Sequence, residues 1–269
     1  MKNIYFLFFL GILWSCTPEI KQENRIREDV AFLASDELEG RQTGTAGEKK
    51  ASDYISKRFK EIGLLEKGTN GYLQPFSFKP KTNPHEEVKF DVNGDGTITG
   101  NNILAYIDNG SENTIIIGAH YDHLGYGGEG SLYRDTIKAI HNGADDNASG
   151  VAIMLDLASK IKNKSFTNNY LFMAFSGEEM GLLGSNYFVK NPLIDTKKVS
   201  YMINMDMVGR LKKDSTLAIY GIGTSPIFKQ TLNAHNKNFK LILQESGVGP
   251  SDHTSFYLAD IPVLHFFTG

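Results

Sequence analysis

Short apolar runs alternate with amphipathic segments over most of the chain. The apolar runs predict strands, which begin at Asn102, Thr114, Tyr170, Val199, Thr216 and Ile261. Apolar residues recur at helical spacing over about 148–162, 180–190 and 225–236, and two further helices are predicted upstream, ending at Gly40 and Gly63. Such alternation predicts an α/β fold, a single domain with a mixed, mostly parallel central sheet flanked by helices on both faces.

The N-terminal residues predict an export signal. Residues 1–16, MKNIYFLFFLGILWSC, contain an early Lys2, an apolar run from Ile4 to Trp14, and then Cys16. The run is shorter than the roughly 20 residues that a membrane-spanning helix needs. Because Cys16 directly follows the run, as in the lipobox of a bacterial lipoprotein, we expect a lipoprotein-type signal peptide. A plain secretory signal with an incidental cysteine is the alternative.

Residues 17–26 are polar and patternless, which predicts a tether, and residues 27–269 then form the domain. The formal net charge of −3 gives no nucleic-acid footprint and no strongly basic membrane face. We therefore expect no nucleic-acid partner, and membrane contact only through a lipid anchor on Cys16. The expected location is the cell envelope, facing the periplasm or the cell surface.

Polar side chains follow three of the predicted strands where each strand ends. TIIIGAH ends at His120, YLFMAFS runs into Glu178 and Glu179, and SYMINM runs into Asp206. The carboxyl ends of strands form the ligand-binding edge of open α/β sheets. Histidine and carboxylate side chains together suit zinc, and several carboxylates in one cleft suit a pair of metals about 3.5–4 Å apart. Without a metal, such a cluster would repel itself and raise its own pKa values.

Four motifs carry a family resemblance. The chain resembles the co-catalytic zinc aminopeptidases related to bacterial leucyl aminopeptidase in the order and approximate spacing of GAHYDHLG, NGADDNASGVA, FSGEEMGLLGS and INMDMVGR. The upstream LASDELEGRQTGTAGEKKASDYI and the downstream SDHTSF are also similar to that family. The resemblance covers roughly residues 27–269. It implies a zinc exopeptidase fold, two zinc ions per chain and peptide substrates.

The resemblance also implies a role for each motif residue. It makes His120 and Asp206 ligands of the first zinc, Asp145 the carboxylate that bridges both metals, and Glu179 a ligand of the second zinc. Glu178 matches the general base, which would take a proton from the attacking water and pass it to the leaving amine.

The neighbours of these residues are expected to have supporting roles. Asp122 lies two residues after His120, so on an extended segment both side chains point the same way, and Asp122 would orient the imidazole by accepting its free N–H. His123, Asp146 and Asn147 are predicted to be local hydrogen-bonding residues, with Asn147 or Asp146 capping the following helix.

The resemblance implies that the second zinc takes a histidine from a segment beyond the strand IPVLHFFTG. This chain stops at Gly269, before any such residue. We therefore expect the C-terminal part of the domain to be missing from this sequence. His253 is the conceivable substitute ligand.

Two alternatives to the exopeptidase stay open at this point. A glutaminyl-cyclase-like transferase shares the fold and a related zinc site, although the paired acids of GADDNASG favour the two-metal peptidases. A surface lipoprotein that uses the fold only for binding, with a metal-deficient site, is the third hypothesis.

Overall fold

The structure is a computed structural model that describes residues 22–80, 86–128 and 130–269. The predicted signal peptide and the first part of the predicted tether lie outside the described residues. Helix α1 (Gln22–Leu33) begins upstream of Arg27, so residues 22–26 of the predicted tether are helical. None of the helices in these three ranges has the length and apolar composition that crossing a membrane requires.

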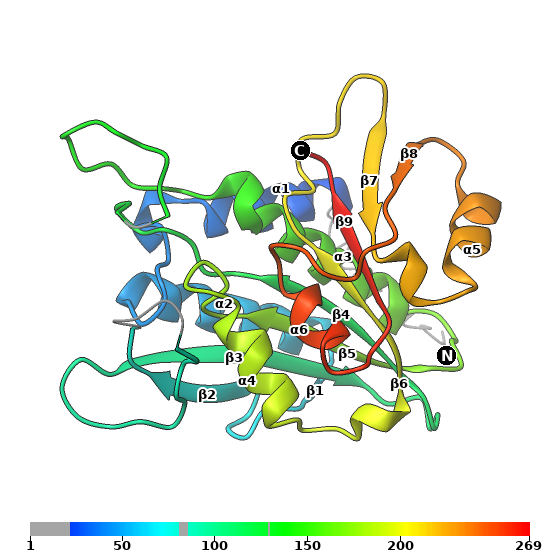
Figure 1. The fold of residues 1–269 in the computed structure, drawn as a ribbon, viewed down its shortest axis with the longest axis horizontal. Coiled ribbons are helices and arrows are strands. Elements are labelled where there is room, and N and C mark those ends of the chain that lie inside the picture. Colours follow the sequence, from blue (N-terminus) through cyan, green and yellow to red (C-terminus); the bar gives the residue numbers. More distant parts are fainter. Residues whose placement is uncertain (1–21, 81–85, 129) are drawn as a thin grey trace, which may run out of the picture.

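In the described part of the chain, nine strands form one sheet (Figure 1). The strands are β1 (Leu65–Glu66), β2 (Leu73–Phe78), β3 (Ile98–Ile107), β4 (Thr114–His120), β5 (Asn169–Phe175), β6 (Val199–Met205), β7 (Thr216–Tyr220), β8 (Lys240–Leu243) and β9 (Val263–Phe267). Their order in the sheet is β1-β3-β5-β4-β6-β9-β7-β8, and β2 also pairs with β3. The central strands β5, β4, β6 and β9 are parallel, whereas β3 and β7 join them antiparallel. The predicted mixed sheet is confirmed, with its longest parallel run at the centre.

Helices cover both faces of this sheet (Figure 1). One face carries α1, α2 (Ala46–Ile62) and α3 (Gly150–Lys162); the other carries α4 (Leu183–Lys190) and α6 (His253–Tyr257), and α5 (Phe228–His235) packs beside β7. Four short helical turns connect these elements: η1 (Asp36–Leu38), η2 (Ala144–Ser149), η3 (Thr196–Lys198) and η4 (Ile222–Thr224).

Strand β5 shows why the central strands are apolar throughout. Phe172 packs into the core beneath α1, α2 and α3, whereas Leu171 and Met173 pack into the core beneath α4 and α6. Successive side chains of a strand point to opposite faces, so a strand covered on both faces needs apolar residues at every position.

Strand β2 was not predicted, because LQPFSF contains Pro75 in its middle. Proline cannot donate to a sheet ladder and is confined to strand positions at the margin of a sheet. Strand β2 meets this condition, because the pairing found for it is with β3, where Pro75 lies opposite Asn101.

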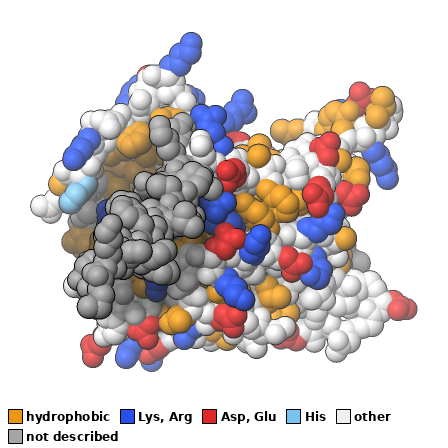
Figure 2. All heavy atoms as spheres, turned by 180° about the vertical axis from the view of Figure 1, so that it is seen from behind, with side chains coloured by type: hydrophobic (Ala, Val, Ile, Leu, Met, Phe, Trp, Pro, Cys, Tyr) orange, Lys and Arg blue, Asp and Glu red, His pale blue; other side chains and the backbone are white. Residues whose placement is uncertain are grey.

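The surface charge is mixed on the face seen from behind in Figure 2. Outside the atoms drawn in grey, acidic and basic side chains are interspersed there. This pattern agrees with the small net charge of −3, because neither sign gathers on that face.

Candidate metal centre

Two groups of side chains that could hold a metal lie where the parallel strands β4, β5 and β6 end, and turn η2 supplies Asp146 to one of them. Within each group the potential ligand atoms lie within 4.8 Å of one another. The groups are His120, Glu178 and Asp206, and His123, Asp146 and Glu179. The parallel pairing of β4 with both neighbours brings three loops to one edge, as the sequence predicted.

The buried imidazole of His120 is the meeting point of the first group. Its Nε2 lies 3.2 Å from Asp146 Oδ1, 3.3 Å from Asp206 Oδ1 and 3.9 Å from Glu178 Oε2. Burial alone would lower the pKa of His120, but the negative charges of Glu178 and Asp206 outweigh it and hold the pKa well above its ordinary value. The surrounding acids therefore favour the protonated, positively charged form of the imidazole.

Asp146, and not the predicted Asp145, faces this cluster. The Asp145 carboxylate turns away and accepts hydrogen bonds from Gly209 N at 2.8 Å and from Ser149 Oγ at 3.4 Å. Asp146 lies against His120 and also belongs to the group with Glu179. The hydrogen bond to Gly209 gives Asp145 its own partner in the loop after β6, so the second acid of the pair, and not the first, lies among the side chains that could hold a metal.

Asn147 fixes the turn that presents Asp146. Its Oδ1 accepts from Gly150 N at 3.0 Å, which confirms the predicted cap of the following helix for Asn147. The same oxygen accepts from Met207 N at 3.3 Å, and its Nδ2 donates to Met205 O at 2.9 Å. Because Met205 and Met207 flank Asp206, one amide ties the turn to the end of β6.

The second group includes a histidine that was predicted to have only local hydrogen bonds. His123 Nδ1 lies 2.6 Å from Glu179 Oε1, and Asp146 completes the group. His253, the expected substitute, belongs to neither group found among the described residues. Its ring instead stacks on His265, with 4.3 Å between the centroids. The spacing of His120 and His123 in GAHYDHLG was the available signal for an imidazole here.

Asp122 contacts the site differently from the prediction. Its carboxylate accepts hydrogen bonds from Glu178 N at 3.1 Å, Glu179 N at 3.3 Å and Thr43 Oγ1 at 3.1 Å. His120 Nδ1 is 3.7 Å from the Asp122 carboxylate but 3.3 Å from its main-chain oxygen. The carboxylate therefore holds the turn that carries both glutamates, and the backbone oxygen orients the imidazole.

Neighbouring acids of the site differ strongly in pKa. Burial raises the pKa of Glu178 to about 9, and the charges of Asp252 and Asp206 add to that effect while His120 opposes it. Burial also acts on Asp206, but the charge and hydrogen bond of His120 overcome it and lower the pKa to about 2. Imidazole nitrogens and carboxylate oxygens at this spacing form a donor set that fits zinc, and divalent cations would offset the repulsion.

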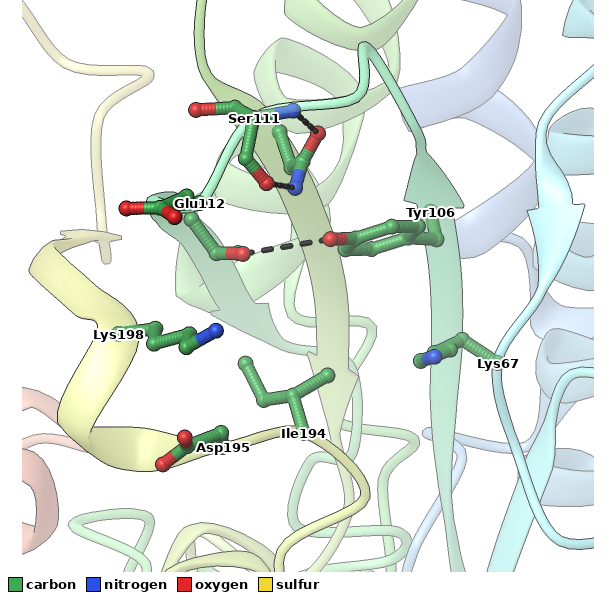
Figure 3. Close-up of a pocket in the computed structure, with 9 residues that line it drawn as sticks. Lys67, Tyr106, Ser111, Glu112, Ile194, Asp195 and Lys198 are labelled. Atoms are coloured by element: carbon green, nitrogen blue, oxygen red, sulfur yellow. Dashed lines mark hydrogen bonds between the residues drawn. The ribbon is translucent and has the colours of Figure 1, made fainter.

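A surface pocket of about 220 Å³ lies at the opposite edge of the sheet, where β4 and β5 begin (Figure 3). Lys67 and Lys198 extend toward it from opposite sides (Figure 3). Glu112 and Asp195 also line it, so the charges of the lining balance. The pocket is separate from the metal-ligating groups.

Known proteins are similar to this chain in sequence and in fold. The profile of peptidase family M28 matches residues 102–269. A probable leucine aminopeptidase of Trichophyton verrucosum is 34% identical over 173 residues, which are 60% of this chain and 44% of that relative. The chain thus spans less than half the length of this curated relative.

Solved structures share the fold. A Zn-dependent exopeptidase from Parabacteroides distasonis superimposes with a TM-score of 0.67 at 22% identity, over 92% of this chain and 82% of the other. A glutaminyl cyclase from Porphyromonas gingivalis superimposes with a TM-score of 0.63 at 20% identity, over 92% of this chain and 82% of the other.

Behind the site, Glu48 of α2 is a buried acid with three hydrogen bonds. Its carboxylate accepts from Tyr121 Oη at 3.1 Å, from Gly44 N at 2.6 Å, and from Ser176 Oγ. Burial raises its pKa from 4.5 to about 7, because the hydrogen bonds only partly offset the loss of hydration.

Glu48→Gln tests this shift. The folded protein keeps the Glu48 proton up to about pH 7 and the unfolded chain releases it near pH 4.5, so this contribution to stability is complete below 4.5 and lost by 7. Glutamine cannot ionise, so the free energy of unfolding of the variant minus that of the wild type should rise with pH over this window, by up to about 3 kcal/mol. Denaturant titrations of chelator-treated protein at several pH values measure it. If the free energy of unfolding depended on pH in the same way for both proteins, that result would contradict the raised pKa of Glu48.

Proposed function

Because this chain belongs to peptidase family M28, we propose that it is a zinc-dependent exopeptidase, and in particular an aminopeptidase that hydrolyses N-terminal peptide bonds. The observation that carries the proposal is that two groups of potential metal ligands meet where Asp146 of the second group contacts His120 of the first, which also contains Glu178. The name of the leucine aminopeptidase relative supports the choice of aminopeptidase.

Two zinc ions are the cofactor that we propose. His120, Asp146 and Asp206 would hold the first, and Asp146, Glu179 and His123 would hold the second. Zinc supplies Lewis acidity that polarises a carbonyl group and activates water. Asp146 would be the carboxylate common to both positions.

Glu178 is the proposed general base. Its Oε2 is farther from His120 Nε2, at 3.9 Å, than the oxygens of Asp146 and Asp206 are, which leaves the carboxylate available for a proton. Burial raises its pKa, and metal cations beside it would oppose that rise, so that the carboxylate would be ionised and able to accept a proton. It would take a proton from the attacking water and deliver it to the leaving amine. Asp122 keeps it in place through the bond from Glu178 N.

The glutaminyl-cyclase-like transferase is the second candidate, because a glutaminyl cyclase shares the fold. The second ligand group, centred on Glu179, favours the two-metal peptidase instead. The third candidate is a binding protein whose metal site is deficient, and a measurement of the zinc content tests it.

We also propose that the protein is exported and anchored to the cell envelope through a lipid on Cys16. The support is the apolar run from Ile4 to Trp14 that ends just before this cysteine. Peptides would be the substrates, and the anchor would be the contact with the membrane.

Asn substitutions at Asp145 and at Asp146 test which of the two carboxylates binds zinc. Asp146→Asn should weaken zinc binding roughly 10–100-fold or more, because the amide lacks the negative charge that would attract both zinc ions. Asp145→Asn is the matched control, and it should keep the zinc content of the wild type because its Oδ1 can still accept from Gly209 N. Zinc per chain is measured by elemental analysis after dialysis. The opposite pattern, with zinc lost only in Asp145→Asn, would assign the bridging position to Asp145.

Glu178→Gln tests the base. We expect the variant to keep its zinc and to lose about 10²–10⁴-fold in kcat, since proton transfer fails while the ligands remain. Release of free N-terminal amino acids from peptides is the activity to follow. Unchanged activity would remove Glu178 from the mechanism.

The same samples separate the alternatives. Formation of pyroglutamate without release of amino acids would support the transferase. Wild-type protein that binds no zinc would support the binding protein.

A further inference from the structure

Arg41 is a fully buried arginine whose side-chain donors all go to main-chain carbonyl groups. A guanidinium group has five N–H donors in all. The acceptors are Tyr121 O at 2.6 Å from Nε, Leu33 O at 2.8 Å and Asn142 O at 2.5 Å from Nη1, and Gly143 O at 2.7 Å and Asp146 O at 3.3 Å from Nη2.

Four of these acceptors belong to the two segments that carry His120 and Asp146. Tyr121 lies directly after His120, and Asp146 is itself the residue that faces both groups. Leu33 ends α1, which supplies a fixed point in the scaffold. One guanidinium therefore spans the loop after β4 and the turn that begins α3.

Main-chain hydrogen bonds also join the backbone around Arg41 to the loop after β4. Arg41 O accepts from His123 N at 3.3 Å, and Gly40 O accepts from Gly125 N at 3.1 Å. Gly143 has a φ of 58°, and a Cβ there would lie 2.7 Å from Arg41 Nη2 and 2.2 Å from Asp146 O. Only glycine allows the turn to approach the guanidinium this closely.

The chemistry of the contact requires arginine. A lysine ammonium has three donors at one point, whereas the planar guanidinium reaches acceptors on several sides. Burial lowers the pKa of Arg41 to about 10, so the group stays charged at neutral pH. Its positive charge interacts favourably with Asp122, Asp146 and Glu179, although none of its hydrogen bonds goes to a carboxylate.

We propose that Arg41 is a positioning residue for the metal centre, which fixes the separation between the His120 loop and the Asp146 turn through their main-chain carbonyls. The inference rests on the proposed two-zinc function. A residue that served the fold alone would affect stability without changing the relative strength of zinc binding.

The test compares Arg41→Lys with Arg58→Lys in the full chain. Arg58 is the matched control, because it is a buried arginine of α2 that binds Asp29 at 2.7 Å and touches neither metal-ligating group. Both variants should lower the midpoint of thermal unfolding in the presence of a chelator. Only Arg41→Lys should also weaken zinc binding, by roughly 10–100-fold, in competition with a chromophoric chelator. The absorption spectrum of the cobalt-substituted protein should change in Arg41→Lys alone.

Each outcome has a separate meaning. Wild-type zinc affinity in folded Arg41→Lys overturns the inference, and so does equal loss of affinity in both variants. Wild-type protein that binds no zinc overturns the proposed function instead.

A second measurement on the wild type applies if Arg41→Lys does not fold. The ¹⁵N side-chain signals of Arg41 should shift, and their hydrogens should exchange more slowly with solvent, when zinc is added. Signals that do not respond to zinc overturn the inference.

Discussion

The structure depends on holding several carboxylates together in a buried place against their own repulsion. Asp146 lies at the centre of this constraint, 3.2 Å from His120 and in one ligand group with His123 and Glu179. Burial raises the pKa of Glu178 to about 9, and the like charges of Asp252 and Asp206 add to that rise. Divalent cations in the site would offset this repulsion, and the imidazole and carboxylate donors fit zinc.

The fold holds these acids through contacts to the backbone of the loops that carry them, rather than through cationic side chains bound to their carboxylates. The parallel register of β4 with β5 and β6 brings three loops to one edge. Asp122 then holds the glutamate turn through two N–H groups, and Asn147 ties the Asp146 turn to the end of β6. Arg41 joins the remaining loops through their carbonyls. Asp122 and Arg41 thus hold the backbone of the glutamate turn and of the Asp146 turn without bonding to the carboxylates of Glu178, Glu179 or Asp146.

The central strands and the edge at which the site lies could be predicted from the sequence, because unbroken apolar runs that end in polar residues are typical of buried parallel strands. The choice between Asp145 and Asp146 could not, since adjacent residues in a turn point in different directions that depend on distant partners such as Gly209. The role of Asp122 was missed in part for the same reason. Its partners, the N–H groups of Glu178 and Glu179, are brought to it only by the pairing of β4 with β5.

The most direct test of this account is a crystal structure of the zinc-loaded protein with anomalous scattering measured on both sides of the zinc absorption edge. We expect two anomalous peaks about 3.5–4 Å apart, with the Asp146 carboxylate between them, one peak beside His120 and Asp206 and the other beside Glu179. A peak bound by Asp145, or the absence of any peak at Asp146, would contradict it.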